Sequence, residues 1–212
     1  MSDTKTEYVD YGWLSAEPEG AAPYVNRAID RLIDPSPGSR VLDVGCGNGY
    51  LAARFAARGC LVVGIDLSES GIAMARRHFP QARFEVAAAD DHMLETLDED
   101  PFDYIVSTEV IEHLYAPDSF VKGMFAALRD GGTAVISTPY HGYVKNLALA
   151  LTAGFDSHWH PSKRGGHIKF WSRRSLIGLL REAGFANCEF RGAGRIPYLW
   201  KSMVIAARRP AA

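Results

Sequence analysis

The chain has 212 residues, of which 47% are apolar and 23% charged, and its formal net charge is −2. This length suits one globular domain, and the composition is that of a soluble protein with an ordinary core. The small net charge does not favour a nucleic-acid partner. The sequence contains no run of about 18 apolar residues, so no membrane span is expected.

The N-terminus and the cysteines indicate a cytoplasmic protein. The first eleven residues are polar and acidic, unlike a secretory signal. Cys46, Cys60 and Cys188 are widely spaced among apolar residues or glycines, and they form no C-x-x-C pair. We therefore expect reduced thiols and no zinc site built on thiolates.

The predicted elements alternate between helices and strands. Residues 1–20 are expected to form an N-terminal arm or lid, and residues 21–212 a single domain. In chain order the pattern predicts a helix at 21–34, a strand at 40–44, a helix at 50–58, a strand at 61–66, a helix at 68–78, strands at 83–88 and 104–107, a helix at 118–129, a strand at 133–137, a helix at 172–183 and strands at 187–192 and 203–207. This alternation is typical of a doubly wound α/β fold closed by an antiparallel hairpin.

A long segment, residues 140–171, interrupts this alternation and is predicted to be an insertion on the substrate side. It holds four of the seven histidines, and irregular segments of this length are usually functional. We expect Tyr140, Tyr143 and Trp171 to flank a flat acceptor, with packing under the loop as the alternative. The leucine- and alanine-rich stretch 147–151 is expected to be a packed helix; the alternatives are a lipid-tail channel or a peripheral membrane contact.

A glycine-rich turn, residues 45–49, connects the first predicted strand to a helix. Its glycines allow a tight turn and close approach of a ligand, and Asp66, at the end of the next strand, can accept both hydroxyls of a ribose. The spacing is G-x-G-x-G, whereas dinucleotide sites have G-x-G-x-x-G. Asp43 would repel a pyrophosphate but can pair with a sulfonium cation. The turn therefore favours S-adenosylmethionine over a dinucleotide, and a turn used only for packing is the alternative.

Residues 41–139 resemble a class I S-adenosylmethionine-dependent methyltransferase in the glycine-rich turn, Gly64-Ile-Asp66, the turn at 88–91, the strand at 102–107 and the Asp-Gly-Gly turn at 130–132. The resemblance implies a Rossmann-like, mixed seven-stranded sheet with an antiparallel last strand. It assigns the ribose to Asp66 and the adenine to Ala89 and Asp90, although Ala88 stands where many members have Asp. The full set of expected cofactor-binding residues is Asp43, Gly45, Gly47, Gly49, Asp66, Leu67, Ala89, Asp90 and Thr108.

A second constellation follows the fourth predicted strand, where such sheets bind ligands. If the chain is helical there, Glu109, Glu112 and His113 share one face and suit a divalent cation. The alternative is a metal-free cleft lined by His113.

The pattern E-x-x-E-H, with the later His167, resembles the ubiquinone-biosynthesis O-methyltransferases and the small-RNA 3′-terminal 2′-O-methyltransferases. The resemblance implies Glu109, Glu112, His113 and His167 as ligands of Mg²⁺ or Mn²⁺. Such an ion would lower the pKa of a bound hydroxyl. Without a metal, His113 or His141 would act as the general base.

The sequence therefore predicts O-methylation of a small hydroxylated aromatic or diol-bearing acceptor, assisted by a divalent cation. Three alternatives stay open: an RNA 2′-O-methyltransferase, a metal-free N-methyltransferase and a non-catalytic protein that binds S-adenosylmethionine. The sequence names neither the acceptor nor the oligomeric state.

Overall fold

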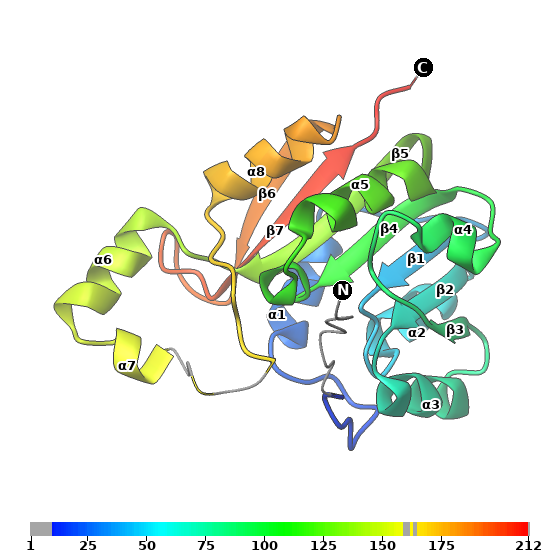
Figure 1. Cartoon of the computed structure of the whole chain (residues 1–212), viewed down its shortest axis with the longest axis horizontal. Helices are drawn as coiled ribbons and strands as arrows, with labels where there is room; N and C mark the ends of the chain where they lie inside the picture. The colour runs from blue at the N-terminus through cyan, green and yellow to red at the C-terminus, as the bar shows by residue number, and fades with distance from the viewer. Residues whose placement is uncertain (1–9, 159–161, 163–164, 212) are drawn as a thin grey trace, which may run out of the picture.

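The computed structural model describes residues 10–158, 162 and 165–211 (Figure 1). Residues 1–9 of the expected arm, and 159–161 and 163–164 of the expected insertion, lie outside the described residues. In the described part of the chain one sheet has seven strands in the order β3-β2-β1-β4-β5-β7-β6. They are β1 (Arg40–Val44), β2 (Leu61–Asp66), β3 (Arg83–Val86), β4 (Phe102–Thr108), β5 (Leu128–Pro139), β6 (Ala186–Ala193) and β7 (Ser202–Arg208).

The sheet is mixed, as predicted. Strands β1 to β5 run parallel, whereas β7 is antiparallel to both β5 and β6. The fold is the Rossmann-like fold of class I methyltransferases, and the closing hairpin is confirmed. Because the first five strands are parallel, their carboxyl ends lie along one edge, where ligands bind in such folds.

Helices cover both faces of the sheet. They are α1 (Ala22–Ile29), α2 (Tyr50–Ala56), α3 (Glu69–His78), α4 (Met93–Leu97), the 3₁₀ turn η1 (Ile111–His113), α5 (Pro117–Ala127), α6 (Tyr143–Leu151), α7 (Phe155–His158) and α8 (Arg173–Glu182). In β4, Ile105 packs into a core with α4, α5 and α8, and its neighbour Val106 into a second core with α1, α2 and α3. Alternate side chains of a strand face opposite sides, so a continuous apolar run indicates a strand buried on both faces.

Several predicted boundaries differ from the structure. Strand β5 begins at Leu128, within the predicted helix 118–129, and passes through Gly131, whose φ of +74° reflects a local irregularity. Helices α4 and α7 were not predicted, and the turn η1 was considered only as a condition under which Glu109, Glu112 and His113 share one face. They span only three to five residues, which is too short for a helical period to show in a sequence.

Helix α6 contains the predicted helix at 147–151, but the expectation that it is packed was wrong for two leucines. Leu147 and Leu151 are 46% and 79% exposed, whereas Lys145 is buried. The physical reason is the position of α6, which projects away from the sheet (Figure 1) and turns Lys145 and Leu149 toward a cavity. No helix in the described ranges is long and apolar enough to cross a membrane.

Candidate active site

The glycine-rich turn connects β1 to α2 at the carboxyl edge of the sheet. The amides of Gly45 and Cys46 donate hydrogen bonds of 2.8 and 2.9 Å to the Ile65 carbonyl at the end of β2. Gly45, Gly47 and Gly49 all have positive φ, a conformation that glycine adopts at little cost. At Gly49 a Cβ would also lie 2.7 Å from the Ala75 side chain, so the turn can pack this closely only with glycine.

Asp66 connects the turn to α3. One carboxylate oxygen accepts a hydrogen bond of 2.8 Å from the Gly47 amide, and the other accepts one of 2.7 Å from the Ser68 amide. Burial raises the pKa of Asp66 despite these donors. The two amides fix the carboxylate at the edge where the ribose is expected, and each oxygen keeps a second acceptor position.

Asp43 is a buried carboxylate that the Ala52 amide compensates only in part and that forms no ion pair with a described cation. It is 1% exposed, and neither oxygen accepts a hydrogen bond of ordinary geometry from a described group. Burial, followed by the nearby charge of Asp66, raises the pKa of Asp43 to about 7. An isolated buried charge is costly, so the site favours a ligand that brings a positive charge.

The described part of the N-terminal arm lies over the glycine-rich turn. The Asn48 amide group donates to the carbonyls of Ser15 and Glu17, at 2.8 and 3.0 Å. The Trp13 ring packs so closely against Gly47 that a Cβ there would collide with it. These contacts place an aromatic ring directly against the expected cofactor loop.

The arm is also attached to the first turn of α3. Asp10 accepts hydrogen bonds from the hydroxyls of Ser68 and Ser70, at 2.7 and 2.6 Å, and from the Ser70 amide at 3.0 Å. These donors lower the pKa of Asp10. A carboxylate at a helix N-terminus is favourable, so this contact stabilises the arm over the turn.

The other expected cofactor residues follow the neighbouring strands. Asp90, after β3, accepts a hydrogen bond of 2.9 Å from the His92 amide, and Ala89 packs against the core. Leu67 is 43% exposed after β2, and Thr108 ends β4. The fold thus gathers all nine residues at one sheet edge, and their individual roles stay predictions.

Glu112, in the turn η1, is tied to two distant segments. Its Oε2 accepts a hydrogen bond of 2.9 Å from the Thr138 hydroxyl in β5. Its backbone carbonyl accepts from the amides of Ile168 and Lys169, at 2.9 and 3.0 Å. These two amides bring His167 beside η1.

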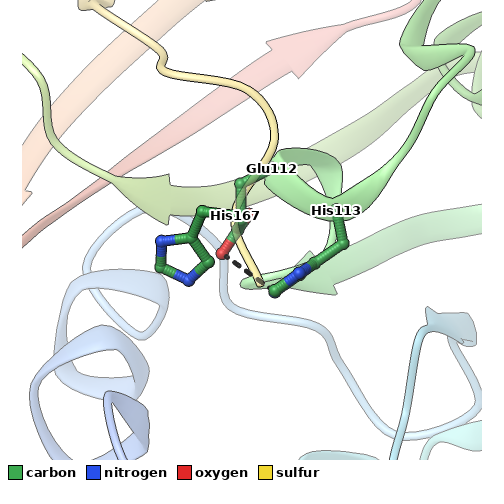
Figure 2. Close-up of side chains that lie close together, drawn as sticks. All are labelled: Glu112, His113 and His167. Carbon is green, nitrogen blue, oxygen red and sulfur yellow. Dashed lines mark ion pairs between the residues drawn. The ribbon is translucent and has the colours of Figure 1, made fainter. Parts of the chain in front are cut away.

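Glu112, His113 and His167 form a cluster whose potential ligand atoms all lie within 4.8 Å of one another (Figure 2). Nδ1 of His113 lies 3.2 Å from the Gly166 carbonyl oxygen. A carbonyl only accepts, so Nδ1 carries the proton and Nε2 carries the lone pair. Nε2 lies 3.9 Å from Oε1 of Glu112. The ring therefore directs its lone pair toward the cluster, as a histidine that ligates a metal must.

The residues of this cluster fit a divalent cation. Glu112 is 1% exposed, and its Oε1 accepts no hydrogen bond from the described residues. Burial, followed by the charge of Glu109, raises its pKa well above the ordinary value. His167 is exposed and His113 partly so, so an ion from solvent can reach the cluster and compensate the buried charge.

Glu109 lies outside this three-residue cluster. The hydroxyls of Ser137 and Ser202 donate to its two carboxylate oxygens, at 2.8 and 3.2 Å. Burial raises its pKa to about 7. Its φ is +55°, a strained value for a residue with a side chain and one often found at functional sites. Its expected role as a metal ligand stays a prediction.

His141 is buried in the insertion, with its ring edge-on to those of His158 and Phe170, at centroid distances of 5.7 and 5.0 Å. Burial, followed by the positive charge of Lys145, lowers the pKa of His141 to about 4. The imidazole is therefore neutral at pH 7 and able to accept a proton, but as a weak base.

The three aromatic residues expected at the acceptor lie apart from one another. Tyr140 is buried against Phe190 and Trp200, and Tyr143 is 80% exposed. Trp171 is half-buried against the core beside α8. None of the three lines the large cavity next to the cluster, so their contact with an acceptor remains a prediction that the geometry does not strengthen.

That cavity has a volume of about 660 Å³ and adjoins Glu109 and His167. Its lining comes from α1, α6, α7 and the β6–β7 loop. Tyr24, Lys145, Arg195, Leu199, Lys201 and Ser202 contribute to it, and sequence reasoning missed them all. They come from three separate stretches of the chain and form no recognised motif, so only folding identifies them as neighbours.

Comparison with known proteins identifies methyltransferases as relatives of this chain. A family model described as "Methyltransferase domain" matches residues 16–189. The chain is 34% identical to a ubiquinone biosynthesis O-methyltransferase of Ruegeria sp. (strain TM1040), over 79% of this chain and 68% of the relative. It is 33% identical to the enzyme of that name from Hahella chejuensis (strain KCTC 2396), over 92% and 84%.

Among solved structures, the fold is similar to that in a complex between the Haloferax volcanii Trm112 methyltransferase activator and a methyltransferase. The TM-score is 0.70, with 18% identity, over 91% of this chain and 90% of the other. At this identity the likeness shows the fold alone.

Proposed function

This chain belongs to the S-adenosylmethionine-dependent methyltransferase family, and on that basis we propose that it methylates a hydroxyl oxygen of a small molecule with two adjacent hydroxyls. A divalent cation held by Glu112, His113 and His167 assists. The observation that carries this proposal is the buried Oε1 of Glu112, which accepts no hydrogen bond from the described residues and lies in a cluster with two imidazoles.

When bound, the cation would hold two adjacent oxygens of a catechol or diol and lower the pKa of the hydroxyl that is methylated. Two imidazoles and one carboxylate suit Mn²⁺ better than Mg²⁺, since Mg²⁺ prefers oxygen ligands. Glu109, beside the same cavity, is a candidate fourth ligand.

The chain's own residues bind and orient the methyl donor. Asp43 supplies a buried negative charge toward the cationic donor, and Asp66 binds its ribose hydroxyls. The Trp13 ring packs against Gly47 of the glycine-rich turn. Methyl transfer to an oxygen needs in-line placement of the two reactants, so most of the rate comes from positioning.

The names of the relatives support an oxygen acceptor, because both are O-methyltransferases. The cluster also argues against a metal-free N-methyltransferase, which would not need a buried carboxylate between two histidines. If no cation binds, His113 or His141 is the candidate base.

The test is methyl transfer from labelled S-adenosylmethionine to catechol, phenol and aniline, with and without a chelator. Transfer to catechol is expected to be abolished by the chelator and restored by Mn²⁺, and to be lost in Glu112→Gln. Glu95→Gln, an exposed carboxylate on α4, is the matched control. Chelator-insensitive transfer to aniline would contradict the proposal, and donor binding without any turnover would favour the non-catalytic alternative.

A further inference from the structure

The cavity beside the cluster is lined by three cations that come from separate elements. Lys145 lies on α6, and Arg195 and Lys201 lie in the loop between β6 and β7. The Lys201 carbonyl links the loop to β5 and α6. The Lys201 carbonyl accepts from the Tyr140 amide at 3.0 Å and from Nζ of Lys145 at 3.4 Å.

These cations lack carboxylate partners in the described structure. None of the three forms an ion pair within 4.0 Å with a described acid. Other basic side chains do form such pairs: Arg40, Arg54, Arg76, Arg83 and Arg209. Among the described lining residues Glu109 is the one carboxylate, and the hydroxyls of Ser137 and Ser202 already bind it.

Lys145 is the most unusual of the three. It is only 5% exposed, and its one hydrogen bond to a described group is the long contact to the Lys201 carbonyl. Burial, followed by the charge of Arg195, lowers the pKa of Lys145 to about 8. The charge of Glu109 opposes this shift without forming an ion pair with Lys145. A buried cation is costly unless nearby negative charge compensates it, and a bound anion would add such charge.

The cavity also has apolar lining and adjoins the proposed reaction centre. Tyr24, Ala148, Leu149 and Leu199 contribute apolar surface, Thr152, His158 and Ser202 are polar, and Glu109 and His167 line the cavity next to the cluster. A molecule that fills this space therefore meets apolar surface and cations while its hydroxyls face the cluster.

We infer that the methyl acceptor carries an anionic group, a carboxylate or a phosphate, that binds between Lys145, Arg195 and Lys201. This inference rests on the proposed function and adds the charge of its substrate. Both groups offer oxygens that accept from several cations at once. A neutral acceptor of the same shape would give the buried Lys145 no bound anion, whereas Arg195 and Lys201 are exposed to solvent in either case.

The test compares three catechols that differ only in one substituent: 3,4-dihydroxybenzoate, 3,4-dihydroxybenzamide and 3,4-dihydroxyphenylphosphonate. Each is titrated calorimetrically into the protein saturated with S-adenosylhomocysteine and Mn²⁺. We expect one of the anions to bind at least tenfold more tightly than the neutral amide, and the tighter of the two identifies the anionic group.

Lys145→Met keeps the length of the side chain and removes its charge, so the anion should then bind about as weakly as the amide. Arg195→Gln should also weaken binding of the anion. Because Arg195 is exposed, this substitution should not affect folding. Lys122→Met, on the exposed face of α5, is the control and should change nothing.

Equal binding of acid and amide, or no binding of either anion, would overturn the inference. Replacing S-adenosylhomocysteine by S-adenosylmethionine separates it from the proposed function. Anion binding without methyl transfer would support the anion site and contradict the proposed reaction. Equal rates of methyl transfer to the acid and the amide would support the proposed reaction and contradict the anion site.

Discussion

The Thr138 hydroxyl donates a hydrogen bond of 2.9 Å to Oε2 of Glu112, so a residue of β5 orients the buried carboxylate of the proposed metal cluster. Thr138→Val keeps the shape and removes this donor. Residues that orient metal ligands typically contribute 10–100-fold to affinity. We expect Thr138→Val to weaken Mn²⁺ binding by about tenfold in a calorimetric titration, with Thr133→Val on the same strand as control. Unchanged affinity would mean that Thr138 does not orient the ligand.

Asp43 predicts a pH-dependent stability. Its folded-state pKa of about 7 lies above the ordinary 3.8, so between these values the folded protein binds more protons than the unfolded chain. The free energy of unfolding should then fall as the pH rises through this window, by at most about 1.4 kcal/mol per pH unit for this one group. The check is the melting temperature of the wild type and of Asp43→Asn from pH 4 to 8. The decline with pH should be shallower in the variant, and parallel curves would refute this assignment.

The same carboxylate should couple donor binding to pH. A cationic donor favours ionised Asp43, so binding of S-adenosylmethionine to the wild type should strengthen as the pH rises from 5.5 toward 7. In Asp43→Asn the affinity should be about tenfold lower, with this part of the pH dependence lost. Calorimetry at several pH values measures both effects. If Asp43→Asn binds S-adenosylmethionine as tightly as the wild type at pH 7.5, the charge of Asp43 does not contribute to donor binding.

The arm should contribute to cofactor affinity. Trp13→Ala removes the ring that covers Gly47, and we expect the dissociation constant for S-adenosylhomocysteine to rise about tenfold, which equals 1.4 kcal/mol. Trp13→Phe should restore part of the affinity. Leu14→Ala is a matched control, since Leu14 is 93% exposed. An arm that has no role would give the same constant in all four proteins.

Two helical glycines should respond oppositely to alanine. At Gly123, on α5, a Cβ would collide with the Asp90 carbonyl and lie 2.8 Å from Met93, whereas at Gly178, on α8, it would meet nothing within 4 Å. Gly123→Ala should destabilise the protein by about 1–3 kcal/mol and weaken cofactor binding through the Asp90 loop. Gly178→Ala should stabilise it by about 0.5–1 kcal/mol. Urea unfolding and calorimetry measure the two effects, and the same sign for both variants would contradict this reading.

The cofactor half of the site could be predicted because its residues are close in sequence or follow regular elements. The glycine-rich turn, Asp43 and Asp66 lie within 24 residues on one strand–helix–strand unit, where local geometry dictates their positions. The alternation of apolar strands and amphipathic helices indicated the parallel sheet for the same reason. Helices of four or five residues, such as α4 and α7, escaped prediction because they show no full period.

The acceptor half could not be predicted in this way. Tyr140 and Tyr143 were expected to flank the acceptor, yet one is packed against Trp200 and the other faces solvent. Their contact with an acceptor stays a prediction. The cavity beside the cluster is lined by Lys145, Arg195 and other residues without a common motif.

By itself, the sequence determined the fold class, the cofactor turn and the Glu112–His113 pair, because each depends on residues a few positions apart. The tertiary structure places His167, which the resemblance had implied, beside this pair. Only the tertiary structure decided that Glu109 lies outside the cluster and binds Ser137 and Ser202. Only the tertiary structure, too, buried Lys145 beside the site. These outcomes depend on backbone and side-chain hydrogen bonds between segments 28 to 93 residues apart, and no local pattern records which of them form.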